Sequence, residues 1–440
     1  MTLRMFKKAN TKQKKKHTRS RHKFKPQLIT RQINDVVRIT TSYLEMKDLI
    51  HVSTICRESY SLYSKPLAVK KLLQAVIDGN LINAEKIISS NPTLLLERGT
   101  VKDYAGRTHI NRTAYQLALG ACDFNVVDLH GNIVVDGMAE MIEKYFQQLP
   151  GKSIQEINQI IQNQHMGQFP ENYDEIEKEK IIEDSKNLHR MFEVLKVAPE
   201  KDAQTILYLE EDILRIIRTE KSERACELHK RSQSIIKANS IDNFQNAFSD
   251  LTNYLVEHSI MRADVNWSLF KALYQFRNYL EPKTSHTIGY HFNHSMFVEA
   301  IQLYEQQFVC NYHHWEASTN MFYCQKVLGY IERFVSVQDA QNMAHGICQL
   351  LRNGEKSKRS LKFHDGGIYF PLDDLKFSRE LGYLRTVTPI GWTLHTIVQT
   401  DEGAANWAIF KTYVKQKQQD RNLRKHRAST RETLVPNKYD

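Results

Sequence analysis

The chain has 440 residues, of which ten are Pro, 17 are Gly and 10% are aromatic. This composition favours a well-packed, helix-rich protein over a disordered or repetitive one, and the length indicates two or three domains. No apolar run approaches the roughly eighteen residues that span a bilayer, so we expect no transmembrane segment. The N-terminus lacks the apolar core of a secretory signal, so we expect no Sec-type export.

The net charge of +11 lies in one segment. Residues 1–26 contain eleven Lys and Arg and no acidic residue. Removing these eleven from the 61 basic residues of the chain leaves 50, which equals the number of acidic residues. We predict a disordered basic tail over 1–26, because it has few apolar residues to bury. It could make weak contacts with nucleic acid or anionic membranes, serve nuclear import, or only increase solubility.

Two short amphipathic helices are predicted over residues 33–63. The apolar positions of this segment fall at helical spacing on either side of a polar break at 45–48, and Asp48 is placed to cap the second helix. Helices of this length cannot bury their apolar faces on each other alone. The segment is therefore either a docking module or the first helical pair of a larger helical domain.

The order of residues from Val36 to Tyr60 resembles an F-box, for which we assign residues 27–66. It departs from that family at its start, where Leu28-Ile29-Thr30 stands in place of the usual Leu-Pro. The resemblance implies binding to the Skp adaptor of a cullin-type ubiquitin ligase. The residues expected to contact Skp are Ile33, Val36, Ile39, Tyr43, Leu44, Leu49, Val52 and Cys56.

Residues 67–150 are predicted to form a short ankyrin-like block. Residues 70–90 indicate a helix, a Gly-Asn turn and a second helix that stops at Pro92. The run 113–118, Thr-Ala-Tyr-Gln-Leu-Ala, resembles the Thr-Pro-Leu-His-x-Ala opening of an ankyrin repeat, with Thr113 as the helix cap. The alternative is a generic helical connector. In the ankyrin interpretation the turn at 103–108 protrudes, and the target-binding residues are Asp103, Tyr104 and Arg107.

The rest of the chain is predicted to be helical, as a domain over 151–355 and a C-terminal segment over 356–440. Long antiparallel helices are expected over 173–198 and 203–238. The Gly-rich tract 365–371 suggests a short β-hairpin, and a last helix is expected over 403–420. The predicted fold class is therefore mainly α, with an N-terminal F-box-like hairpin, an ankyrin-like block, a larger helical domain and at most a small β-hairpin. Predicted helices of the larger domain also cover 242–258, 265–280, 294–308, 316–334 and 337–352.

Familiar catalytic signatures are missing from the sequence, which has no GxxxxGK[ST], GxSxG, HExxH or GxGxxG. We therefore assign no catalytic residue, cofactor or metal. The six cysteines are scattered and none forms a CxxC pair, so we expect free thiols in a reducing compartment. A zinc site from Cys310, His313 and Cys324 matches no known spacing. Glu175, Glu177 and Glu179 alternate along a charged helix and are expected to be solvated. His189 and Glu193, four residues apart, share a helix face and could orient a base, but we expect a surface pair.

Eight further stretches are notable, namely Asn91 to Leu96, Gly99 to Thr108, Thr113 to Gly120, Gly137 to Ile142, Lys326 to Phe334, Asp339 to Gln341, Arg359 to Phe363 and Tyr369 to Asp373. Together they resemble effectors that intracellular bacteria of the Legionella kind secrete by a type IV system. That resemblance implies delivery into the cytosol or nucleus of a host cell. It supports a host-directed adaptor that recruits an unidentified host target to a Skp-cullin ligase. The alternative is an effector enzyme, such as a transferase, whose active site lies in 286–374 around His286, His291, His294, His313 and His314.

Overall fold

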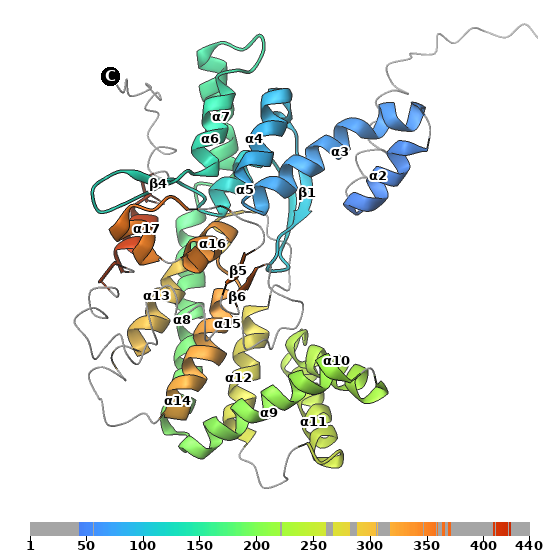
Figure 1. Cartoon of the computed structure of the whole chain (residues 1–440), viewed down its shortest axis with the longest axis vertical. Coiled ribbons are helices and arrows are strands. Elements are labelled where there is room, and N and C mark those ends of the chain that lie inside the picture. Colours follow the sequence, from blue (N-terminus) through green and yellow to red (C-terminus); the bar gives the residue numbers. More distant parts are fainter. Residues whose placement is uncertain are drawn as a thin grey trace, which may run out of the picture. The chain divides into compact units, whose positions relative to one another are not determined.

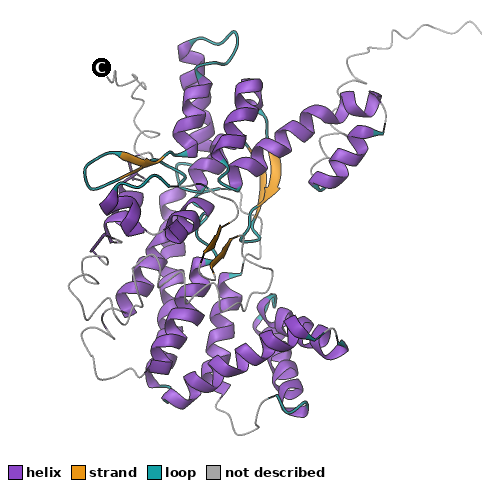
Figure 2. Cartoon of the chain, viewed as in Figure 1, coloured by secondary structure: helices purple, strands orange, loops and turns teal. Residues whose placement is uncertain are grey.

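The computed structural model is mainly α-helical, as the sequence predicts. Figure 1 traces the elements along the chain, and Figure 2 separates helices from strands. The chain divides into two compact units, residues 1–64 and 65–440. The structure describes residues 44–55, 57–220, 222–260, 267–281, 288–304, 306, 317–345, 347–357, 359, 363–365, 368–370, 408–409, 411–420 and 422–423.

In the first unit, helix α2 spans Met46–Thr54 and helix α3 begins at Arg57. The predicted first helix, over 33–44, lies almost wholly outside the described residues, as does the basic tail. The N-cap of α2 is Glu45, and Asp48 sits in the first turn, so the prediction that Asp48 caps this helix is wrong. An acidic residue in the first turn still stabilises the helix through its dipole. Helix α3 (Arg57–Ile77) contains Pro66, so the predicted boundary at 66/67 falls inside a helix.

The predicted helix, turn and helix of residues 70–90 are confirmed. Helix α3 ends at Ile77, Gly79 adopts φ +65° in the turn, and α4 (Leu81–Ser90) follows. Glycine suits this position because an L side chain is strained at positive φ. The Asn80 side chain accepts a hydrogen bond from the backbone N–H of Asn83 at 3.1 Å and caps α4. Pro92 then opens the short 3-10 helix η1 (Pro92–Leu96).

Two β-hairpins flank helix α5 (Ala114–Gly120) in residues 99–135, where none was predicted. Strands of two to five residues are too short to leave a clear alternating pattern in the sequence. The hairpin predicted at 365–371 is present. The three antiparallel pairs of the described chain are β1 (Gly99–Lys102) with β2 (Thr108–Arg112), β3 (Val126–Val127) with β4 (Ile133–Val135), and β5 (Phe363–Asp365) with β6 (Ile368–Phe370).

The remaining helices of the second unit agree with the predicted helical segments, although 203–238 and 337–352, each expected as one helix, contain two helices each. The stretch 203–238 forms two helices, because Ser222 caps the second by accepting a hydrogen bond from the backbone N–H of Ala225 at 3.2 Å. Residues 408–409, 411–420 and 422–423 are helical as well. The labelled helices are α6 (Met138–Phe146), α7 (Ile154–Gln168), α8 (Tyr173–Val197), α9 (Glu200–Thr219), α10 (Glu223–Ile236), α11 (Ile241–Glu257), α12 (Trp267–Leu280), α13 (His294–Tyr304), α14 (Ala317–Phe322), the π-helix η3 (Tyr323–Leu328), α15 (Gly329–Glu332), α16 (Val337–His345) and α17 (Ile347–Asn353).

Two hydrophobic cores organise the second unit. The first buries the facing sides of α3, α4, α5, α6 and α7. The second runs along α8, against which α12 and α13 pack, and continues through η3, α15 and the helical stretch 411–420 (Figure 1). Burial of these faces is the main stabilising contribution, because it removes apolar surface from water. Buried polar side chains, among them Arg107 and Lys417, connect elements of the first core with elements of the second.

Candidate functional site

The F-box-like segment is described from residue 44 onward. Ile33, Val36, Ile39, Tyr43 and Cys56, five of the eight predicted contact residues, lie outside the described residues. Of the other three, Leu44 and Val52 are half-buried, whereas Leu49 is fully buried. Leu49 is expected to contact Skp, but its side chain packs inside the protein and has no exposed surface for that contact.

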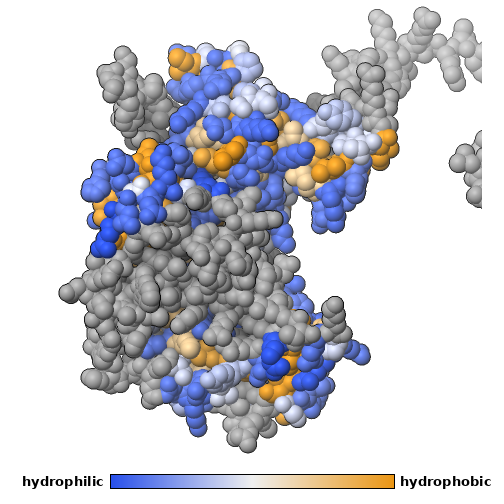
Figure 3. Space-filling model, in the orientation of Figure 1, coloured by the Kyte–Doolittle hydropathy of each residue, from blue (hydrophilic) through white to orange (hydrophobic). Residues whose placement is uncertain are grey.

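A different set of apolar side chains is exposed in this segment. Ile50 is 39% exposed, Ile55 is 73%, Tyr60 is 63% and Leu62 is 41%. Figure 3 shows apolar surface over the α2–α3 region beside hydrophilic surface. Four large apolar side chains within thirteen residues form a group of the kind that marks protein–protein contact sites. We call these four residues the α2–α3 apolar group. All four residues belong to the apolar positions from which the sequence predicts two helices. Their spacing does not show which apolar side chains are exposed and which are packed inside the protein.

The turn predicted to protrude with the target-binding residues is instead buried. Asp103 and Arg107 are 6% and 4% exposed, and Tyr104 is half-buried. The Asp103 carboxylate accepts hydrogen bonds from the backbone N–H of Arg107 at 2.8 Å and from its Nε at 2.7 Å. The Arg107 guanidinium also donates to the carbonyl oxygens of Phe334, at 2.9 Å, and of His291. The prediction of a protruding turn is wrong, because these polar groups find their partners inside the protein.

The negative charge of Asp103 is balanced by neighbouring basic side chains. Burial raises the pKa of the Asp103 carboxyl, but Arg107 and His109 outweigh burial and hold that pKa below its usual range. Burial lowers the pKa of His109, whose ring lies 4.0 Å from the His291 ring, centroid to centroid. The Tyr104 hydroxyl donates to the Val335 carbonyl oxygen. This centre ties the β1–β2 hairpin to the segment after α12 and to the end of α15, so its evident role is structural.

A second buried polar centre surrounds Asp339 at the start of α16. Its carboxylate accepts hydrogen bonds from the Tyr413 hydroxyl at 2.6 Å and from the Ser336 hydroxyl at 2.7 Å. His294 Nε2 lies 2.9 Å from the same carboxylate, and Lys417 Nζ lies 3.2 Å from it. The Lys417 ammonium donates as well to the Cys122 carbonyl oxygen at 2.9 Å. The Asp339 carboxylate therefore connects α16 with α13 and with the helical stretch 411–420, which are distant in the sequence.

The Asp339 centre has acid–base groups but no access for a substrate. Burial raises the pKa of Asp339, but Lys417, His294 and Tyr413 outweigh burial and hold that pKa below its usual range. Burial and the neighbouring carboxylate of Asp339 raise the pKa of Tyr413 well above that of a free tyrosine. His294 Nδ1 is buried and has no hydrogen-bond partner in the described part of the chain. A general base must reach the proton it takes, and this one is enclosed.

The other sequence candidates do not come together in the described chain. Burial raises the pKa of Cys324 to about 12, which disfavours the thiolate that zinc needs. Cys310 and His313 lie outside the described residues, as do His286 and His314. Within the described residues no group of three His, Cys, Asp or Glu could hold a metal ion.

The predicted surface residues of α8 lie at the surface. Glu175 and Glu179 are exposed and Glu177 is half-buried, as expected for a solvated face. His189 Nε2 lies 2.9 Å from the Glu299 carboxylate of α13, so its partner is on another helix and not at Glu193. This contact joins α8 to α13 at the surface and indicates no catalytic arrangement.

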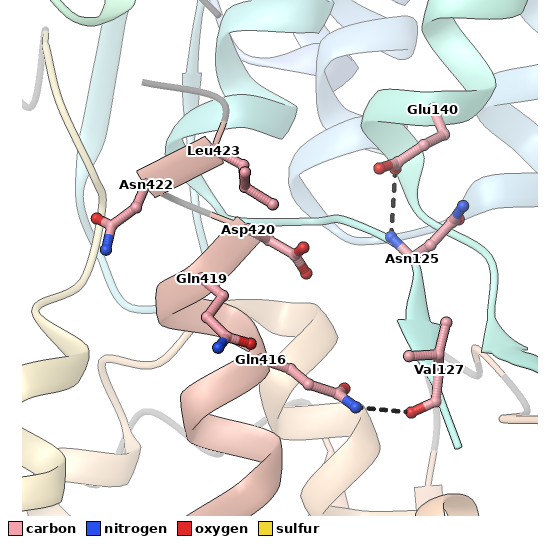
Figure 4. A pocket seen from close by; sticks show the side chains of 8 residues that line it. All are labelled: Asn125, Val127, Glu140, Gln416, Gln419, Asp420, Asn422 and Leu423. Atoms are coloured by element: carbon pink, nitrogen blue, oxygen red, sulfur yellow. Dashed lines mark hydrogen bonds between the residues drawn. The ribbon is translucent and has the colours of Figure 1, made fainter. Parts of the chain in front are cut away.

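A pocket of about 560 Å³ opens between the helical residues 416–423 and the segment from Asn125 to α6 (Figure 4). Gln416 Nε2 donates to the Val127 carbonyl oxygen at 3.1 Å, and Glu140 accepts from the backbone N–H of Asn125 at 3.3 Å. These bonds fix two walls of the pocket. No sequence signal pointed to it, since its walls come from residues nearly 300 positions apart. Its described lining is Asn125, Val127, Glu140, Gln416, Gln419, Asp420, Asn422 and Leu423.

Comparisons with protein-family models, with curated proteins and with solved structures find no match to this chain. Among the described residues, no helix is both long and apolar enough to cross a membrane. What the molecule does must therefore be argued from its own surfaces and buried centres.

Proposed function

We propose that this protein is a host-directed substrate adaptor that docks on the Skp adaptor of a cullin-type ubiquitin ligase through residues 27–66. The second unit then holds a host target for ubiquitination. The observation that carries the proposal is the α2–α3 apolar group, which lies within the segment that resembles an F-box. Large apolar side chains that remain exposed on short helices are suited to fill the groove of a partner.

The exposed positions fit docking better than packing. Ile55, between α2 and α3, is 73% exposed and Tyr60 is 63% exposed, so both retain most of their surface for a partner. Isoleucine and tyrosine each bury a large area when an interface forms, and tyrosine is common among the residues that dominate binding energy. Leu49 of α2 is fully buried and has no exposed surface for such a contact.

The chemistry of the second unit supports binding over catalysis. The acid–base groups of the Asp103 and Asp339 centres are buried and paired, and they link helices to one another. Of the five histidines that the enzyme alternative requires, only His291 and His294 lie in the described residues, and both are buried. Catalytic groups must contact the reacting atoms, so these two are poorly placed for chemistry. An adaptor needs only rigid surfaces, which such centres provide.

The resemblance to secreted effectors gives the setting of the proposal. An adaptor of this kind acts in the cytosol or nucleus of a host cell, where the Skp-cullin ligase is present. Within the described chain Cys122, Cys226 and Cys324 form no disulfide. Cysteines outside disulfides are common in reducing compartments of this kind.

The test uses exposed residues, because substitution of Leu49 would disturb folding. The variant Ile55→Asp/Tyr60→Asp places two charges in the α2–α3 apolar group. The matched control is Val197→Asp, which places a charge on an apolar side chain that is 77% exposed at the end of α8. Binding of the full-length protein to purified Skp–cullin complex is measured by biolayer interferometry. We expect the double variant to bind at least about 30-fold more weakly and the control to bind as the wild type does.

Three outcomes would refute the proposal. The first is a wild-type protein that does not bind the Skp–cullin complex at all. The second is equal binding by the wild type and the double variant while circular dichroism shows both to be folded. Loss of binding in Val197→Asp as well would mean that the contact lies elsewhere, which also removes the assignment to residues 27–66.

A further inference from the structure

We propose that Arg98 and Arg112 bind the phosphate group of a phosphate monoester, carried either by a phosphorylated side chain or by a free small molecule. The two arginines lie at the open end of the β1–β2 hairpin, before β1 and at the end of β2. The site belongs wholly to the second unit and does not rest on the proposed docking through residues 27–66.

The register of the hairpin brings the two arginines together. Gly99 of β1 pairs with Arg112, the last residue of β2, and Arg98 directly precedes Gly99. Neighbouring strands are about 4.8 Å apart, so long side chains at adjacent positions reach one another. Arg98 Nη1 also donates to the carbonyl oxygen of Asn111, the residue before Arg112, at 3.1 Å. This bond holds the Arg98 side chain across the end of the hairpin.

Neutral acceptors orient both guanidinium groups. Arg112 Nη1 donates to the carbonyl oxygen of Gly167 on α7 at 2.7 Å. Arg98 Nη1 donates to Oε1 of Gln116 on α5 at 3.3 Å. Helix α5 packs against both α7 and β2, so these acceptors are fixed by the fold. Carbonyl and amide oxygens carry no net charge, so the two positive charges are held in place but are not neutralised.

Carboxylates do not compensate these charges within the part of the chain that the structure describes. Neither Arg98 nor Arg112 forms an ion pair there with Asp or Glu. Glu97, next to Arg98 in the sequence, instead lies 2.6 Å from Nζ of Lys65. The same hairpin shows the usual alternative, since Arg107 is buried against the carboxylate of Asp103.

Arg112 is the less favourably placed of the two charges. Its side chain belongs to a residue that is 7% exposed, and its Nε is buried without a hydrogen-bond partner in the described chain. Burial lowers the pKa of Arg112 to about 10, and the charge of Arg98 acts in the same direction. Arg112 is still protonated at neutral pH. A buried charge without a counter-ion is costly, so an anion beside this pair would be bound favourably.

The chemistry of the pair selects a phosphate group. A guanidinium presents a planar fork of N–H donors that matches the oxygens of phosphate and carboxylate. Two such groups carry two positive charges, whereas a carboxylate supplies only one negative charge. A phosphate monoester supplies about −1.5 to −2 at neutral pH, with three acceptor oxygens. Arg98 is exposed, so a ligand can reach it from solvent while the charge of Arg112 strengthens the attraction.

The experiment measures binding to the full-length protein by isothermal titration calorimetry. The probes are a Gly/Ala nonapeptide with a central phosphoserine, the same peptide with serine, and glycerol 3-phosphate. We expect saturable binding of at least one phosphate-bearing probe, weakening of that binding by added salt, and at least about tenfold weaker binding of the serine peptide.

The variants are Arg98→Gln and Arg112→Gln, with Arg190→Gln as the matched control. Arg190 is exposed on α8 and donates to Oδ1 of Asn187, so its replacement removes the same charge from a different surface. We expect each hairpin variant to weaken binding at least about tenfold, as for the loss of one charge-assisted hydrogen bond, and the control to bind as the wild type does. Arg98 is exposed, so Arg98→Gln decides alone should Arg112→Gln unfold.

The probes separate the sources of the phosphate. Binding of the phosphoserine peptide, lost in Arg98→Gln, assigns the site to a phosphorylated protein segment. Binding of glycerol 3-phosphate alone, with the same sensitivity, assigns it to a free small molecule. The proposal is overturned if the wild type binds neither phosphate-bearing probe. It is also overturned if folded Arg98→Gln binds them as the wild type does, because binding to the basic residues 1–26 would persist in that variant.

A role for the phosphate itself is required as well. Equal affinities for the phosphoserine and serine peptides, without binding of glycerol 3-phosphate, would mean that the protein binds the peptide and not its phosphate group, and would overturn the assignment of Arg98 and Arg112.

Discussion

Replacement of Lys417 by methionine tests how much the buried ammonium contributes to holding the helical stretch 411–420 in the protein. The Lys417 side chain is 1% exposed, and its ammonium lies 3.2 Å from the Asp339 carboxylate and 2.9 Å from the Cys122 carbonyl oxygen. Methionine keeps most of the stem and removes the charge. Asp339 is then a buried anion that retains only its hydrogen-bonded neighbours Ser336, Tyr413 and His294.

The magnitude follows from the loss of one member of a buried pair. Removal of one partner of a buried ion pair typically costs about 3–5 kcal/mol, because the other charge stays buried. Three hydrogen bonds continue to stabilise the Asp339 carboxylate, so we expect Lys417→Met to lower the free energy of unfolding by about 3 kcal/mol, the lower end of that range. The double variant Lys417→Met/Asp339→Asn removes both charges. We expect it to recover at least about half of that loss, since no uncompensated charge remains.

Urea unfolding followed by far-ultraviolet circular dichroism measures these differences, and hydrogen exchange locates them. The amides of residues 411–420 should exchange faster in Lys417→Met than in the wild type, and those of the double variant should lie between the two. Lys415→Met, an exposed position two residues away, is the matched control and should change neither measurement. A loss below about 1 kcal/mol in Lys417→Met would refute the reasoning, as would a double variant less stable than the single one.

Three further changes have defined outcomes. The pKa values of Asp339 and Asp103 in the folded protein lie below the ordinary value, so both carboxylates stabilise the protein above about pH 4 and lose that contribution as pH falls. The loss of stability with falling pH, followed by circular dichroism, should therefore be less steep in Asp339→Asn than in the wild type. Thr113→Val removes the cap of α5 and should lower the free energy of unfolding in urea by about 1–3 kcal/mol, whereas Thr113→Ser should retain most of it. Gly120→Ala would place a Cβ atom 2.3 Å from Nε2 of His291 and should lower the melting temperature, consistent with a cost of about 1–3 kcal/mol.

Local features of the fold could be predicted because their signals lie close together in the sequence. Thr113 and Gln116 form a capping box three residues apart, and Gly79 marks the turn between α3 and α4. The break between α9 and α10 was missed because its signal is the single cap Ser222 inside a charged stretch. The hairpins of residues 99–135 were missed for a similar reason, since strands this short show no periodicity.

The buried centres could not be predicted because their members are distant in the sequence. Arg107 donates to carbonyl oxygens 184 and 227 residues further along the chain, and no pattern within 103–108 indicates those partners. A turn of Asp, Tyr, Gly and Arg has the composition of an exposed loop, which led to the wrong assignment of Asp103, Tyr104 and Arg107 to a protruding surface. The same residue types are tolerated inside the protein only when each polar group finds a partner, and here the partners come from the tertiary fold.

Burial of the Asp339 centre favours a structural role over a catalytic one for His294. His294 next to a carboxylate has the composition of a catalytic pair, and a sequence alone cannot distinguish that role from a structural one. His294 and Asp339 are 5% and 0% exposed, so neither can contact a substrate unless the elements around them open. Departure of residues 411–420, for example, would withdraw Lys417 from Asp339 and would cost several kcal/mol by the same argument as the Lys417→Met substitution. The α2–α3 apolar group lies at the surface and needs no such opening, which is why we propose a binding role for this protein.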